Sequence, residues 1–179
     1  MKNIVIRIII SIVVILVISA CSEEEEETIT AAEHFGCKGS SSGSGPTIGG
    51  VTLEEATYKS GTKSFAFVNS TSANFSYSSV TTPLCYTIDV SSTTASMLKT
   101  NSANTGNATM GGQSLSGFDN VTAYYTTMKQ GTWADTPTTY HLYIYADTDS
   151  SFYINLWGYT TKAAADANFW MKEAAYTKQ

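Results

Sequence analysis

The sequence predicts a mainly β domain, an antiparallel sheet or β-sandwich that carries one C-terminal α-helix. From Thr47 onward the chain is rich in Thr, Ser, Tyr and Val, which favour strands over helices. Short apolar runs in this region are separated by Gly, Asn, Asp and Ser, the residues that mark turns. Residues 162–176 differ, because they are rich in alanine and place apolar side chains at helical spacing.

The strands are predicted from short runs of β-branched and aromatic residues bounded by turn residues. They are Val51–Tyr58, Lys63–Val68, Asn74–Ser78, Leu84–Val90, Ser96–Thr100, Val121–Lys129, Tyr140–Ala146 and Phe152–Trp157. Residues 101–118 include the polar stretch NSANTGNATMGGQSLSG, which predicts a long loop with room for a short strand.

The last two of these strands form a predicted hairpin whose register follows from their apolar faces. Alternate residues of a strand face the same side, so a one-residue slip would send one apolar set to the wrong face. The natural solution opposes Ala146 with Phe152, Ile144 with Ile154 and Leu142 with Leu156. The other face then carries Tyr145 opposite Tyr153, Tyr143 opposite Asn155 and His141 opposite Trp157.

The sequence makes this second face the candidate ligand-binding site of the protein. Tyr and Trp combine a large apolar area with a polar tip at small entropic cost, which suits recognition of sugars or of an extended peptide. The alternative is that this face lies beneath the C-terminal helix or a second sheet. The residues concerned are His141, Tyr143, Tyr145, Tyr153, Asn155 and Trp157.

The alanine-rich segment predicts one helix over about Lys162–Tyr176, with Thr160 or Thr161 as its N-cap. Phe169 and Trp170 are expected to pack this helix on the sheet.

Cys37 and Cys85 predict a disulfide, because a cysteine pair in an oxidising compartment is most often bonded. The bond would close a loop of roughly 50 residues and contribute about 3–4 kcal/mol through chain entropy. Free thiols are one alternative. The other is a metal site that uses His34 with Cys37, although a second clustered ligand pair is lacking.

The N-terminus has the pattern of a secretory signal peptide. Lys2 and Arg7 precede an apolar or small run, Ile8–Ala20, whose 13 residues are fewer than the roughly 20 that span a bilayer. The exit, Ile18-Ser19-Ala20-Cys21, resembles the lipobox of bacterial lipoproteins, in which a branched apolar residue and two small residues precede a cysteine.

This resemblance implies that cleavage follows Ala20 and that Cys21 carries a diacylglyceryl group, often with a further acyl chain on its amine. Two or three acyl chains anchor a protein stably where one does not. The alternative is an uncleaved signal anchor. Because Ser22 is not aspartate, the resemblance also implies sorting to the outer membrane.

Three segments are therefore expected: a signal peptide over 1–20, a lipidated tether over 21–46 and a β-rich domain over 47–179. Glu23–Glu27 and the later Gly/Ser-rich stretch are typical of solvated spacers. From Lys38 onward the chain has eight lysines against nine acidic residues, a net charge of −1, and Arg7 is the only arginine of the sequence. This balance argues against nucleic acid as a partner and leaves the bilayer, a glycan or a protein.

No catalytic residue, metal site or cofactor other than the lipid is predicted. GGQSLSG departs from a nucleophile elbow at Ser116, and the loop from Asp147 to Ser151 lacks the glycine and glutamate of a calcium loop. The first hypothesis is a lipid-anchored envelope protein with a non-enzymatic binding or structural role. The alternatives are a carbohydrate- or peptide-binding module and a hydrolase whose paired carboxylates only the fold would bring together.

Overall fold

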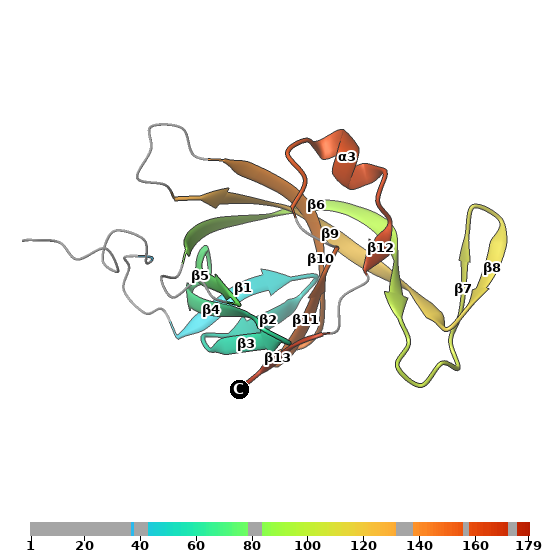
Figure 1. Ribbon diagram of the computed structural model, residues 1–179, viewed down its shortest axis with the longest axis horizontal. Coiled ribbons are helices and arrows are strands. Elements are labelled where there is room, and N and C mark those ends of the chain that lie inside the picture. Colours follow the sequence, from blue (N-terminus) through green and yellow to red (C-terminus); the bar gives the residue numbers. More distant parts are fainter. Residues whose placement is uncertain (1–36, 38–42, 79–83, 132–137, 156–157, 172–174) are drawn as a thin grey trace, which may run out of the picture.

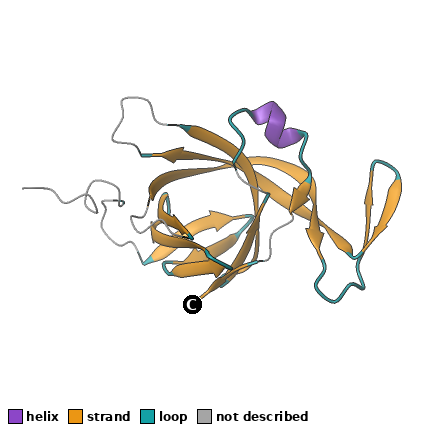
Figure 2. Cartoon of the chain, in the orientation of Figure 1, coloured by secondary structure: helices purple, strands orange, loops and turns teal. Residues whose placement is uncertain are grey.

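The computed structural model describes Cys37 and residues 43–78, 84–131, 138–155, 158–171 and 175–179. The residues predicted to form the signal peptide and the lipobox lie outside this part of the chain, as do Leu156 and Trp157. The described chain consists mainly of antiparallel strands with one short helix, as Figure 2 shows, and this confirms the predicted fold class. Within the described residues, no helix has the length and apolar character needed to cross a bilayer.

The main sheet closes on itself (Figure 1). Its antiparallel strands follow one another in the order β6, β5, β4, β3, β13, β11, β10 and β9, and β9 then pairs with β6. The short strand β12 pairs in parallel with the last part of β6, at Leu98 and Lys99. The bounds are β3 Thr57–Ser60, β4 Lys63–Asn69, β5 Ser72–Tyr77, β6 Leu84–Thr100, β9 Phe118–Gln130, β10 Thr139–Thr148, β11 Ser151–Ile154, β12 Trp170–Met171 and β13 Tyr176–Lys178.

A separate hairpin fills one end of the closed sheet. It consists of β1 (Ser44–Ile48), which begins before Thr47, and β2 (Val51–Glu54). Ile48 and Leu53 are fully buried in the core inside the ring. The Glu54 amide donates to the Asp149 carbonyl (3.2 Å), so the hairpin is fixed to the end of the ring where β10 finishes.

The predicted register of the β10–β11 hairpin is confirmed where the structure describes both partners. Ile144 opposes Ile154, Tyr145 opposes Tyr153 and Ala146 opposes Phe152. The expected partner of His141, Trp157, lies outside the described residues. In the described chain His141 forms a bridge with Tyr159 instead, and β11 ends at Ile154.

Several strand limits also differ from the prediction. The segment expected as one strand over 51–58 divides into β2 and β3, and the segments 84–90 and 96–100 belong to the single long strand β6. A register shift between Val90 and Thr94 bends β6. This irregularity explains why the sequence predicted two strands where the structure has one. The region expected as a loop over 101–118 forms a hairpin of β7 (Asn107–Met110) and β8 (Gln113–Ser116), which projects away from the ring in Figure 1.

The prediction of one helix over 162–176 is wrong. The helix α3 covers only Lys162–Asp166, although Thr161 caps it as expected by accepting the Ala164 amide (3.2 Å). The Asn168 side chain donates to the Ala164 carbonyl (2.7 Å), and the Phe169 carbonyl then accepts the Leu98 amide of β6 (2.8 Å). These bonds outside the helix divert the backbone into β12.

The disulfide between Cys37 and Cys85 is present, with Cα atoms 4.7 Å apart, and this prediction is confirmed. Cys85 lies in β6, and the Cys37 amide donates to Asn74 Oδ1 of β5 (2.7 Å). The bond therefore ties the segment that precedes the domain to the outer wall of the closed sheet.

Candidate functional site

Strand alternation decides which side chains enter the closed sheet. In β4, Phe65 and Phe67 are buried in the inner core, so Lys63 lies on the same inward side at the start of the strand. Tyr77 opposes Lys63 at the end of β5. In β6, Leu84 and Tyr86 face inward by the same alternation, whereas Cys85 faces outward.

These strand ends surround a pocket with a volume of about 290 Å³. It lies at the end of the ring where β4, β6 and β10 begin and β5 and β9 finish, opposite the β1–β2 hairpin. Its wall contains no carboxylate among the described residues. The lining residues are Lys63, Phe65, Phe75, Tyr77, Leu84, Tyr86, Met128, Gln130, Tyr140, Leu142, Ile154, Gly158 and Tyr176.

The floor of the pocket is an aromatic and aliphatic surface. Phe65 lies with its ring centroid 4.7 Å from Phe75 and 5.2 Å from Tyr176. Met128, Leu142 and Ile154 complete it, and each is at most 8% exposed. Such a floor binds apolar matter by removing its surface from water, at about 25 cal/mol per Å². It offers nothing to stabilise a charge.

The polar groups of the pocket gather at its mouth. The Tyr86 and Tyr140 hydroxyls both donate to Gln130 Oε1, each over 3.4 Å. These distances are long for a hydroxyl donor, whose usual range is about 2.5–3.0 Å, so both hydroxyls are weakly held. Burial, with the neighbouring Tyr140 and Tyr77, raises the pKa of Tyr86 to about 12, so its hydroxyl stays protonated at neutral pH.

The disulfide places Cys37 beside this mouth. Cys85 lies between Leu84 and Tyr86, which both line the pocket, and its sulfur bonds to Cys37 on the outer side. Fifteen residues, 22–36, separate Cys37 from the predicted lipidation site at Cys21.

The outer face predicted as the binding strip lies on the other side of the same sheet. Tyr143 is 3% exposed and Asn155 is fully buried, whereas His141, Tyr145 and Tyr153 are half-buried. The Asn155 side chain accepts the Tyr143 amide (2.6 Å) and donates to the Asn168 carbonyl (3.2 Å). The segment after α3 therefore covers the middle of the strip.

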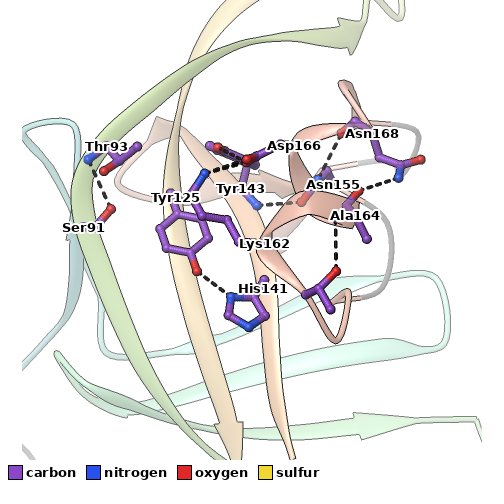
Figure 3. Close-up of polar contacts among 11 residues, drawn as sticks. Ser91, Thr93, Tyr125, His141, Tyr143, Asn155, Lys162, Ala164, Asp166 and Asn168 are labelled. Atoms are coloured by element: carbon purple, nitrogen blue, oxygen red, sulfur yellow. Dashed lines mark hydrogen bonds and ion pairs between the residues drawn. The ribbon is translucent and has the colours of Figure 1, made fainter.

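Figure 3 shows how α3 is fixed over this face. The Tyr143 hydroxyl donates to Asp166 Oδ1 (2.8 Å), and Lys162 Nζ forms an ion pair with the same carboxylate (2.7 Å). The hydrogen bonds from Lys162 and Tyr143 lower the pKa of Asp166. The Tyr125 hydroxyl and His141 Nδ1 form a short hydrogen bond of 2.5 Å beside the helix.

At the other end of the strip a lysine covers the aromatic rings. Lys99 Nζ lies 5.3 Å from the Tyr145 ring centroid and 4.8 Å from that of Tyr153, and it forms an ion pair with Asp147 (3.1 Å). Burial alone would lower the pKa of Lys99, but the Asp147 hydrogen bond and Tyr153 outweigh it and raise that pKa. The side chains of this strip are therefore mostly engaged in contacts within the protein.

Sequence reasoning missed the pocket because no local motif marks it. One signal was present in the sequence. Alternate residues of two strands, Lys63, Phe65 and Phe67 in one and Phe75 and Tyr77 in the other, predict that aromatic side chains share one face of the sheet. Only the closure of the sheet brings these rows opposite Gln130 and Tyr140.

Comparison of the chain with protein-family models, with curated proteins and with solved structures gives no match.

Proposed function

We propose that this protein is a lipid-anchored envelope binding protein that takes a small, largely apolar ligand into the open end of its closed sheet. The observation that carries the proposal is the pocket of about 290 Å³, whose apolar floor lies beneath a few polar groups at the mouth. Small-molecule sites typically combine a concave apolar surface with a few placed polar groups, and their volumes are roughly 300–1,000 Å³. This pocket suits a ligand at the small end of that range.

The anchor is part of the proposal. Cys21 follows the lipobox-like Ile18-Ser19-Ala20, and we propose that it carries the lipid and holds the protein at the outer membrane. The disulfide to Cys85 supports a role in which the pocket works close to this anchor, because it joins the anchored segment to the wall beside the mouth.

The pocket favours this function over the two alternatives. A hydrolase with paired carboxylates would need two of them facing one cavity, and the described wall of the pocket has none. Recognition of a glycan or peptide by the outer strip would need accessible ring faces, whereas Tyr143 is buried and Lys99 lies over Tyr145 and Tyr153.

The binding function is tested with N-phenyl-1-naphthylamine, a neutral apolar dye whose fluorescence rises in an apolar site. Leu84→Trp places a larger ring on the inner side of β6 at the mouth, and Thr87→Trp places the same ring on the exposed outer side of that strand. We expect the dye to bind the wild type and Thr87→Trp equally, and Leu84→Trp at least tenfold more weakly. Equal binding to all three proteins, or none to any, would contradict the proposal.

The anchor is tested by metabolic labelling with a clickable fatty acid. Wild-type protein should carry the label and sediment with membranes, whereas Cys21→Ala should lose the label and leave the membrane fraction. Cys37→Ala is the matched control and should remain labelled, since Cys37 is bonded within the domain. Equal labelling of the wild type and Cys21→Ala would rule out lipidation at this residue.

A further inference from the structure

Aromatic rings from β4, β5, β6, β10 and β13 form much of the pocket wall. Phe75 meets Tyr86 edge to face, with ring centroids 5.8 Å apart and ring planes at 83°. Tyr86 in turn lies 6.2 Å from Tyr140, with the planes tilted by 49°. Rings in tilted and edge-to-face arrangements attract one another, because the positive edge of one meets the negative face of the next. The aromatic lining residues are Phe65, Phe75, Tyr77, Tyr86, Tyr140 and Tyr176.

A flat aromatic ligand would continue this arrangement of rings. Its edge or face would meet the rings of Phe75 and Tyr86, in addition to burying its own apolar surface. A saturated ring of the same size buries a similar apolar area but lacks the charge distribution of an aromatic ring. The lining therefore favours an aromatic body over a saturated one.

Tyr86 shows how the pocket treats a negative charge. Burial is the largest cause that raises its pKa to about 12, followed by Tyr140 and Tyr77. A tyrosine pKa rises where the surroundings disfavour the anion, so the mouth as a whole disfavours a negative charge at this oxygen. Lys63 lies in the same lining but is already engaged in an interaction within the protein.

A positive charge is no better accommodated. The described part of the lining contains no carboxylate, and its polar groups beside the rings of the mouth are hydroxyls and one amide. Burying an unpaired charge costs much more than burying a neutral group that keeps a hydrogen bond. The pocket therefore favours an uncharged ligand.

Two hydroxyl donors at the mouth suit a neutral oxygen acceptor. The Tyr86 and Tyr140 hydroxyls share one acceptor, Gln130 Oε1, each over 3.4 Å. Because bonds of this length are weak, either hydroxyl loses little when it turns to a ligand oxygen at the usual distance of about 2.5–3.0 Å. A carbonyl or ether oxygen at the mouth would therefore be recognised.

We infer that the ligand is a small uncharged aromatic compound with one hydrogen-bond acceptor. Its ring would pack against Phe75 and Tyr86, and its acceptor would meet the hydroxyl of Tyr86 or Tyr140. This inference rests on the proposed function, since it names the ligand class of the same pocket.

The ring and the charge are tested by titrating the wild type with compounds of similar size at neutral pH. Binding is followed through the ¹³C-labelled methyl group of Met128, which lines the pocket. The probes are acetophenone, its anionic analogue benzoate, its cationic analogue benzamidine and its saturated analogue cyclohexyl methyl ketone. Acetophenone should bind at least about tenfold more tightly than either charged compound, and about threefold more tightly than the saturated ketone.

The acceptor contact is tested with the double variant Tyr86→Phe/Tyr140→Phe, which removes both hydroxyls and keeps both rings. The dissociation constant of acetophenone should rise about tenfold, as the loss of one hydrogen bond predicts. Ethylbenzene has no acceptor and should bind the double variant within about twofold of the wild type, which shows that the pocket is intact. Tyr145→Phe removes a hydroxyl from the outer face and should leave acetophenone binding unchanged. An equal loss for acetophenone and ethylbenzene, or no loss for acetophenone, would contradict the hydroxyl contact.

The outcomes separate this inference from the proposed function. If N-phenyl-1-naphthylamine binds and Leu84→Trp weakens it, but benzoate or benzamidine binds as tightly as acetophenone, the pocket stands and the uncharged class is wrong. Equal binding of acetophenone and cyclohexyl methyl ketone would overturn the aromatic preference. The ligand class is also wrong if the dye binds in the pocket and none of these compounds shifts Met128. If neither the dye nor any of these compounds binds there, both proposals fail.

Discussion

Tyr176 stacks on Phe152 with ring centroids 5.1 Å apart and ring planes only 8° apart. The two residues oppose each other in the pairing of β13 with β11, and β13 also pairs with β3. Both rings are at most 1% exposed. The last residues of the chain therefore close the ring of strands and form part of the pocket floor.

Tyr176→Ala should reduce the free energy of unfolding by about 3–5 kcal/mol, the usual cost of removing a large buried ring. Urea denaturation measures it. Tyr176→Phe is the control, because it keeps the ring on Phe152 and should retain most of the stability. A loss as large in Tyr176→Phe as in Tyr176→Ala would contradict the assignment of the stabilisation to ring packing.

Gly49 and Gly50 form the turn of the β1–β2 hairpin, with φ values of +60° and +87°. A Cβ at Gly49 would lie 2.4 Å from Tyr124 Cε2, whereas one at Gly50 would meet no atom within 4 Å. Gly50→Ala should therefore cost about 1 kcal/mol for its backbone conformation alone. Gly49→Ala should cost roughly 1–3 kcal/mol more, because the Tyr124 ring must move. Equal costs in urea denaturation would show that the hairpin does not press on this ring.

Tyr143→Phe removes the hydrogen bond that fixes α3 to β10 through Asp166. The expected cost is about 1 kcal/mol, and hydrogen exchange at the α3 amides should become faster. Tyr145→Phe is the control, because its hydroxyl reaches Asp147 (3.1 Å) away from the helix. Its α3 exchange should equal that of the wild type, and a matching acceleration would disprove the local coupling.

The raised pKa of Tyr86, caused first by burial, predicts a loss of stability at alkaline pH. Below the ordinary tyrosine pKa of 10.0 the phenol is protonated in both states, so it makes no pH-dependent difference. Between that value and about 12 the unfolded chain releases the proton while the folded chain keeps it, so stability falls as pH rises. Urea denaturation at several pH values should show a smaller fall in Tyr86→Phe. Parallel curves for the two proteins would mean that Tyr86 does not contribute.

The part of the fold that local patterns determine was predictable. The two-residue periodicity of β10 and β11 led to the correct partners for Ile144 and Ala146. The role of Tyr176 was not predictable, because its alanine-rich surroundings favour a helix. The pairing of Tyr176 with Phe152 and of Thr177 with Lys59 joins distant parts of the chain. Since β13 closes the ring, a prediction without this strand also lacks the pocket. Strand alternation correctly grouped the residues of the outer strip on one face of the sheet. It could not show that the C-terminal segment covers this face.

The central claim, that ligand enters the ring and not the outer aromatic face, is tested most directly by NMR of protein with ¹³C-labelled methionine methyl groups. Met128 lines the pocket, whereas Met97 and Met171 belong to the cluster on the outer face. Titration with N-phenyl-1-naphthylamine should shift the Met128 methyl signal and leave those of Met97 and Met171 in place. Shifts of Met97 or Met171 with Met128 unchanged would contradict this claim.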